Sequence, residues 1–93
     1  MKKTAEKNHC YRFQGKDRKW AAIVACDETA ARIMFQKEYR ISDKRFEDLE
    51  VRTRQLPMSA RLKSPYSNDT VSVALILNTV LFTPRLICDD EDY

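Results

Sequence analysis

The sequence is poor in the residues from which recognisable catalytic sites are built, because its 93 residues include one glycine and one histidine. A single glycine excludes a glycine-rich phosphate-binding loop. The histidine, His9, has no serine, cysteine or carboxylate at a spacing that forms a catalytic dyad or triad. An HExxH metal-binding pattern is absent as well. We therefore predict that the protein is not an enzyme and takes no cofactor.

Cysteine is also sparse, and its spacing argues against cross-links and metals. Cys10, Cys26 and Cys88 are an odd number of widely spaced residues, and no two of them form a CxxC pair. Such a set does not make a disulfide framework. His9 and the three cysteines are four potential zinc ligands, but structural zinc sites usually contain a close ligand pair. We expect buried thiols and no metal.

Long apolar runs are missing too. No run reaches the roughly 20 residues that span a bilayer, and Lys and Arg crowd the first twenty residues, where a signal peptide needs an apolar core. The sequence predicts a cytoplasmic protein that does not bind a membrane. With 43% hydrophobic and 33% charged residues, it has the composition of a soluble globular chain. Its length leaves room for one domain.

The apolar residues that are present predict a hairpin followed by a helix. Residues 1–8 are polar and are expected to be a flexible lead-in. Tyr11 and Phe13 alternate with polar residues, and residues 20–26 are apolar on both faces, so two strands meet around Gly15, whose expected role is a positive φ angle. Asp27 is a suitable N-cap for a helix over residues 28–40. Residues 49–54 alternate as a third strand.

These elements predict an α+β fold in which a ββαβ unit packs one helix on an antiparallel sheet. Residues 55–69 contain two prolines and are expected to be an extended connection. Residues 70–83 are the most apolar stretch, and their β-branched residues favour a strand or a hairpin, although a buried helix also fits. We expect this stretch to complete the core or a dimer interface. A single domain over residues 9–88 would then precede an acidic tail, residues 89–93.

Charge is unevenly distributed along the chain. Residues 1–66 hold sixteen of the seventeen Lys and Arg and nine of the fourteen acidic residues, whereas residues 67–93 hold Arg85 and five acidic residues. The hairpin tip places cations beside an aromatic side chain, a combination that binds single-stranded nucleic acid. Arg12, Arg52 and Arg54 extend the patch across an exposed sheet face if their strands are neighbours, although Trp20 also fits a core position. The residues of this predicted basic face are Lys16, Arg18, Lys19, Trp20, Arg52 and Arg54.

The acidic end suggests a different partner. Its four consecutive carboxylates resemble the charge of a phosphate backbone and suit a basic groove on another protein. They are Asp89, Asp90, Glu91 and Asp92.

The leading interpretation is a non-enzymatic regulator or inhibitor, of the kind encoded by phages and other mobile elements. It would act by protein–protein contact on a nucleic-acid-handling partner. One alternative is direct RNA or DNA binding through the basic hairpin and sheet face. A second is a structural homodimer subunit.

Overall fold

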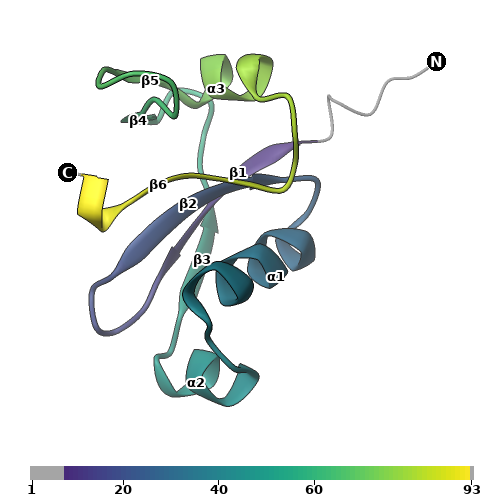
Figure 1. Cartoon of the computed structure of the whole chain (residues 1–93), viewed down its shortest axis with the longest axis vertical. Helices are drawn as coiled ribbons and strands as arrows, with labels where there is room; N and C mark the ends of the chain where they lie inside the picture. Colours follow the sequence, from purple (N-terminus) through teal and green to yellow (C-terminus); the bar gives the residue numbers. More distant parts are fainter. Residues whose placement is uncertain (1–7, 93) are drawn as a thin grey trace.

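A computed structural model describes residues 8–92 of the protein (Figure 1). All but the last residue of the expected lead-in, and the last residue of the expected tail, lie outside this range. The predicted α+β fold class is confirmed. The elements in chain order are β1 (His9–Gln14), β2 (Trp20–Ala25), α1 (Glu28–Tyr39), α2 (Asp43–Asp48), β3 (Arg52–Gln55), β4 (Arg61–Lys63), β5 (Thr70–Ser72), α3 (Val73–Thr79), β6 (Arg85–Asp89) and the 3-10 turn η2 (Asp90–Asp92).

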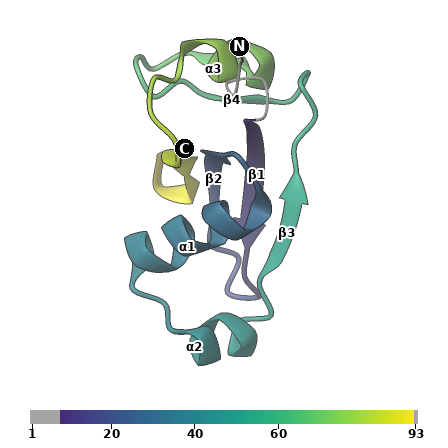
Figure 2. The ribbon, with the colours of Figure 1, turned by 90° about the vertical axis from the view of Figure 1, so that its right-hand side faces the viewer.

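The centre of the molecule is a four-stranded antiparallel sheet in the order β3-β1-β2-β6. Helix α1 lies over one face of this sheet (Figure 2). Strands β4 and β5 form a separate antiparallel pair, which lies with α3 at one end of the molecule. The ββαβ unit therefore carries a small additional layer made by residues 56–82.

The tight β1–β2 connection was predicted correctly, but the reason for its glycine differs from the prediction. Gly15 does not have a positive φ angle; Arg18 adopts one instead, at 71°. A Cβ atom on Gly15 would lie 2.8 Å from Asp17 Oδ1 and 3.5 Å from Leu49 Cβ. The close approach is therefore to the end of the Asp17 side chain, and the turn does not require a left-handed glycine at this position.

Helix α1 follows the prediction from its N-cap onwards. The Asp27 carboxylate accepts a hydrogen bond of 2.8 Å from the Ala30 N–H, which satisfies one of the free donors of the first turn. The helix buries Ala31 and Phe35 against the sheet. The Phe35 ring stacks on Phe13 of β1, with 4.9 Å between the ring centroids. This contact lies at the centre of the first hydrophobic core.

The opposite face of the sheet carries a second core at the end near the small layer. Cys10, Val24 and Cys88 of the sheet pack there with Leu62 of β4 and Ile76 of α3. Because β2 is apolar on both faces, it contributes to both cores, as the sequence predicts for a central strand.

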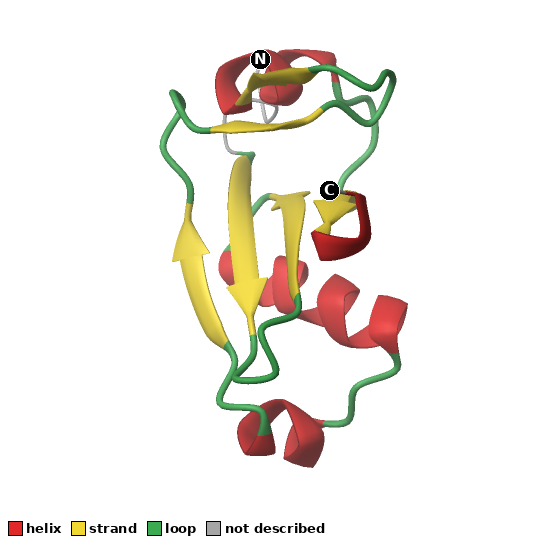
Figure 3. Cartoon of the chain, turned by 90° about the vertical axis from the view of Figure 1, so that its left-hand side faces the viewer, coloured by secondary structure: helices red, strands yellow, loops and turns green. Residues whose placement is uncertain are grey.

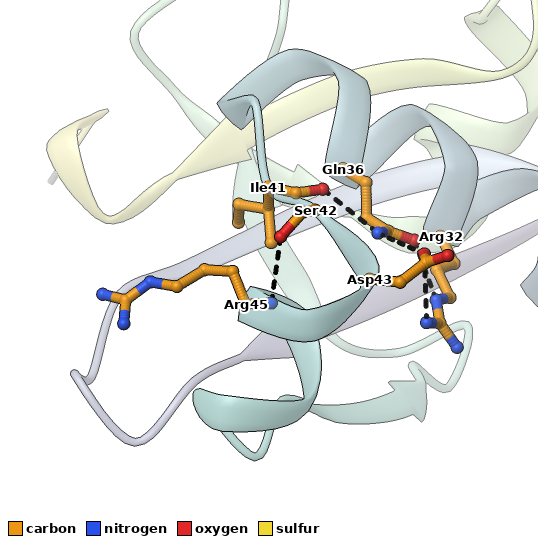
Figure 4. Close-up of polar contacts among 6 residues, drawn as sticks. All are labelled: Arg32, Gln36, Ile41, Ser42, Asp43 and Arg45. Carbon is orange, nitrogen blue, oxygen red and sulfur yellow. Dashed lines mark hydrogen bonds and ion pairs between the residues drawn. The ribbon is translucent and has the colours of Figure 1, made fainter.

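Helix α2 was not predicted. The predicted third strand covers residues 49–54. In the structure, residues 43–48 are helical and β3 begins at Arg52. The Ser42 hydroxyl accepts a hydrogen bond of 3.1 Å from the Arg45 N–H and caps the helix. Asp43 then accepts a hydrogen bond of 2.9 Å from Gln36 and lies 3.7 Å from Arg32, so polar contacts join α2 to α1 (Figure 4).

Residues 70–83 were favoured as strands, and this prediction is wrong for most of them. Only Thr70–Ser72 are extended; Val73–Thr79 form α3, whose N-cap is Ser72. Val73 and Ile76 lie three residues apart and are both buried, so packing overrides their β-branched preference. The connection over residues 55–69 likewise contains a strand, β4, which pairs with β5.

The prediction that a separate acidic tail begins at Asp89 also needs correction for residues 89–92. Asp89 is the last residue of β6, which pairs with β2 at the edge of the main sheet. Residues 90–92 continue as the turn η2. All described residues of the predicted acidic tail, Asp89 to Asp92, therefore belong to β6 or η2.

Candidate functional site

One part of the main sheet is not covered by any element of residues 8–92. On the face opposite α1, the small layer lies across one end, and the strands remain open toward the β1–β2 turn (Figure 3). Strand alternation places the side chains of Arg12 and Gln14 from β1, Trp20 from β2, and Arg52 and Arg54 from β3 on this open face. We call these five residues the open basic face.

The register of the strands brings like charges together on this face. Arg12 pairs directly with Arg54, and Gln14 pairs with both Arg52 and Trp20. Strands β1, β2 and β3 contain no acidic residue. Like charges directly opposite each other on neighbouring strands are destabilising. The open basic face therefore holds a concentration of positive charge that its own strands do not neutralise.

Arg12 is held in place by an aromatic contact. The carbon at the centre of its guanidinium lies 4.6 Å from the centroid of the Trp20 ring. Both side chains are half-buried. The buried Nε of Arg12 has no hydrogen-bond partner among residues 8–92. A buried donor left unpaired costs free energy, so the position of Arg12 on the sheet is not explained by hydrogen bonds from its Nε.

A cleft of about 230 Å³ opens beside this arginine. Arg12, Trp20 and Arg54 form one side of it, and Arg61 of β4 adds a third guanidinium from the small layer. The Arg61 side chain donates a hydrogen bond of 2.7 Å to the Thr70 carbonyl. The remaining lining residues are apolar: Leu56, Ala60 and Leu62.

The structure divides the basic residues that the sequence grouped together. Arg52, Arg54 and Trp20 do share one face. Lys16 instead pairs with Glu50 at 3.7 Å, with both side chains largely exposed, and Lys19 lines a cavity on the α1 side of the sheet. Arg18 is exposed in the turn. The hairpin tip is thus separate from the open basic face.

Sequence reasoning missed Arg61. It lies in the segment expected to be an extended connection, and its approach to Arg12 depends on how the small layer docks on the sheet. Nothing in the local pattern around residue 61 signals that contact.

Three of the four carboxylates predicted to bind a partner have contacts within the chain. Asp89 accepts a hydrogen bond of 2.7 Å from the Tyr39 hydroxyl, and Asp90 accepts one of 3.2 Å from the Trp20 N–H. Asp92 accepts one of 2.8 Å from the Asp89 N–H. These residues anchor the end of β6. Their carboxylates are turned toward internal donors, which suits a structural role better than mimicry of a phosphate backbone.

A second cavity, of about 290 Å³, lies on the α1 side of the sheet. Lys19, Arg40 and Arg45 line it together with Asp17, Asp89, Asp90 and Glu91, so its charges are mixed. Burial of Tyr39, and then its hydrogen bond to Asp89, raise the pKa of the tyrosine well above its usual range.

The remaining chemistry of the described chain is limited. Among residues 8–92, no three His, Cys, Asp or Glu side chains lie close enough together to hold a metal ion. Cys10 and Cys88 are buried, and Cys26 is exposed. Burial, with a smaller contribution from Cys88, raises the pKa of the Cys10 thiol to about 12, so this thiol is not an activated nucleophile.

Comparison with protein-family models, with curated proteins and with solved structures finds no match for this chain. None of the helices in the described part is long and apolar enough to cross a membrane.

Proposed function

We propose that this protein is a non-enzymatic cytoplasmic binding protein whose open basic face binds single-stranded nucleic acid. The observation that carries the proposal is the uncompensated pairing of Arg12 with Arg54 on a sheet face without acidic residues. A strand of phosphates supplies the anions that such a face lacks, and phosphate contacts dominate the affinity of nucleic-acid-binding proteins.

The shape of the face favours a single strand over a duplex. Proteins that bind single strands combine a positively charged groove with aromatic side chains along it. Here the cleft holds three arginines beside Trp20. Because Arg12 already lies over the Trp20 ring, we assign the affinity mainly to phosphate contacts, with weak dependence on base sequence.

The test is a salt series of binding to labelled single-stranded and double-stranded RNA and DNA, followed by fluorescence anisotropy. If about four arginines contact phosphates, log K should fall with log salt at a slope of about −3 for a single strand. Arg52→Gln should weaken binding and make the slope shallower by about 0.7. The matched control is Arg45→Gln, which removes the same charge from an exposed position on α2. Equal effects of the two variants would contradict the proposal.

A second function deserves testing because of a separate observation. Leu81 and Phe82, between α3 and β6, are 82% and 74% exposed. Exposed large apolar side chains are typical of protein contact sites. A regulator that contacts a nucleic-acid-handling protein, or a homodimer, would use this loop. Leu81→Ser with Phe82→Ser would then abolish partner capture or the dimer mass measured by light scattering, and would leave oligonucleotide binding intact.

A further inference from the structure

The cleft beside Arg12 collects three guanidinium groups from three strands and two sheets. Arg12 comes from β1, Arg54 from β3 and Arg61 from β4. None of the described residues that line the cleft is acidic. These three arginines therefore line one cleft because the small layer packs on the main sheet.

Two of the three guanidinium groups are already positioned by contacts within the chain. The Arg12 guanidinium lies within cation–π distance of the Trp20 ring, and the Arg61 side chain donates a hydrogen bond to the Thr70 carbonyl. Neither contact consumes all five N–H donors of an arginine. Arg54 is exposed, so its side chain is accessible to a ligand on the same face. Preorganised donors lower the entropic cost of binding.

The arginines of the cleft point to the chemistry of the ligand. An arginine can offer two parallel N–H groups to the oxygens of a phosphate. Arg54 and Arg61 are exposed and line the cleft, so their N–H groups are accessible to such a ligand. Leu56, Ala60 and Leu62 add an apolar lining to the cleft, so its polar side chains are the arginines.

The cleft is small for a whole ligand. At about 230 Å³ it lies below the range of about 300 to 1,000 Å³ typical of pockets for drug-sized molecules. A single tetrahedral anion with part of its attached sugar fits this scale better than a complete cofactor.

We propose that this cleft is a subsite for one phosphate group, bound by Arg12, Arg54 and Arg61. This inference rests on the proposed function, because the phosphate group is expected to belong to a nucleic-acid strand. Free inorganic phosphate has the same chemistry and is the other source. The subsite fixes one nucleotide on the protein, and the remainder of the strand then follows Arg52 along β3.

The experiment observes the arginine Nε–Hε signals of the full chain by ¹H–¹⁵N NMR. Inorganic phosphate and a short single-stranded oligonucleotide are titrated separately. We expect the Arg12 Nε–Hε signal to shift with both probes. Arg61→Gln should weaken binding of both by about tenfold, because it removes one charge-assisted donor. Arg61→Lys keeps the charge but not the paired donors, and should restore binding only in part.

Arg45→Gln is the matched control, and the amide spectrum of each variant verifies its fold. If phosphate leaves the Arg12 signal unchanged and Arg61→Gln binds the oligonucleotide like the wild type, the subsite is wrong, even if Arg52 still supports strand binding. If phosphate binds in the cleft but no oligonucleotide binds, the subsite stands with free phosphate as its ligand. The proposed function is then wrong.

Discussion

Arg12 and Arg54 occupy directly opposed positions on neighbouring antiparallel strands, although both side chains are cationic. A sheet selected only for stability would place an acidic or apolar residue at one of the two positions. The stacking of Arg12 on Trp20 holds one charge in place, and Arg54 remains exposed beside it. The two cations are therefore placed next to each other with no acidic residue of β1 or β3 between them.

Replacing Arg54 should raise the stability of the protein and lower its affinity for an oligonucleotide. Arg54→Gln removes the cross-strand repulsion, so we expect the free energy of unfolding to rise by about 0.2 to 0.5 kcal/mol at low salt. The same variant should bind a single-stranded oligonucleotide more weakly. Urea unfolding and fluorescence anisotropy measure the two effects. A variant that loses both stability and affinity would show that Arg54 has a structural role instead.

The hydrogen bond from Tyr39 to Asp89 should stabilise the attachment of β6. Tyr39→Phe removes only the hydroxyl that joins α1 to the end of this strand, so we expect a loss of about 1 kcal/mol in the free energy of unfolding. Tyr66→Phe is the comparison, since its exposed hydroxyl has longer contacts, of 3.2 and 3.4 Å. It should cost less. Equal losses in urea unfolding would refute a specific role for Tyr39.

The second core should depend on α3. Ile76 is 1% exposed, whereas its neighbour Leu75 is 49% exposed. Ile76→Val should cost about 0.5 to 1.5 kcal/mol and Ile76→Ala about 2 to 5 kcal/mol, because each leaves a cavity in a packed interior. Leu75→Ala should change stability by less than about 0.5 kcal/mol. Thermal and urea unfolding of the three variants tests the placement of this helix.

Stability should fall at alkaline pH because of Cys10. Its pKa rises from 9.0 to about 12 on folding, so the stabilisation of the neutral buried thiol is complete below pH 9. Between pH 9 and pH 12 the unfolded chain releases a proton that the folded chain retains. The free energy of unfolding then decreases by up to about 1.4 kcal/mol per pH unit from this group.

Urea unfolding at pH 8 and at pH 10.5 measures this decrease. Cys10→Ala should make the decrease shallower, whereas Cys26→Ala, which removes an exposed thiol, should leave it close to that of the wild type. If Cys10→Ala keeps the full wild-type decrease, another group must be responsible for the alkaline loss.

The parts of the fold that the sequence predicted correctly have strong local signals. Alternation in β1, the apolar run of β2 and the Asp27 cap of α1 each determine an element within about ten residues of chain. The sequence could not reveal α2 in the same way, because its six residues contain one apolar side chain, Phe46, and therefore no period. Alternation also indicated that Arg12, Arg52 and Arg54 would share one face if their strands were neighbours, and the pairing of β1 with β3 meets that condition.

The parts that were missed depend on contacts between distant segments. The helical state of residues 73–79 follows from the burial of Val73 and Ile76 against the main sheet, which outweighs their β preference. Strand β6 has a short apolar run, and it pairs with β2 although residues 26–84 separate the two strands in sequence. Arg61 joins the cleft for the same kind of reason, because β4 reaches the sheet through tertiary packing.

The position of β6 also constrains how the protein assembles. Its partner strand, β2, is synthesised early, yet the two strands are separated in sequence by α1, α2, β3 and the whole small layer. Closing so long a loop slows folding relative to a domain with local contacts of the same size. Until residues 85–89 leave the ribosome, one edge of β2 offers unpaired backbone groups to any extended segment nearby. A nascent chain arrested before this point is therefore prone to self-association.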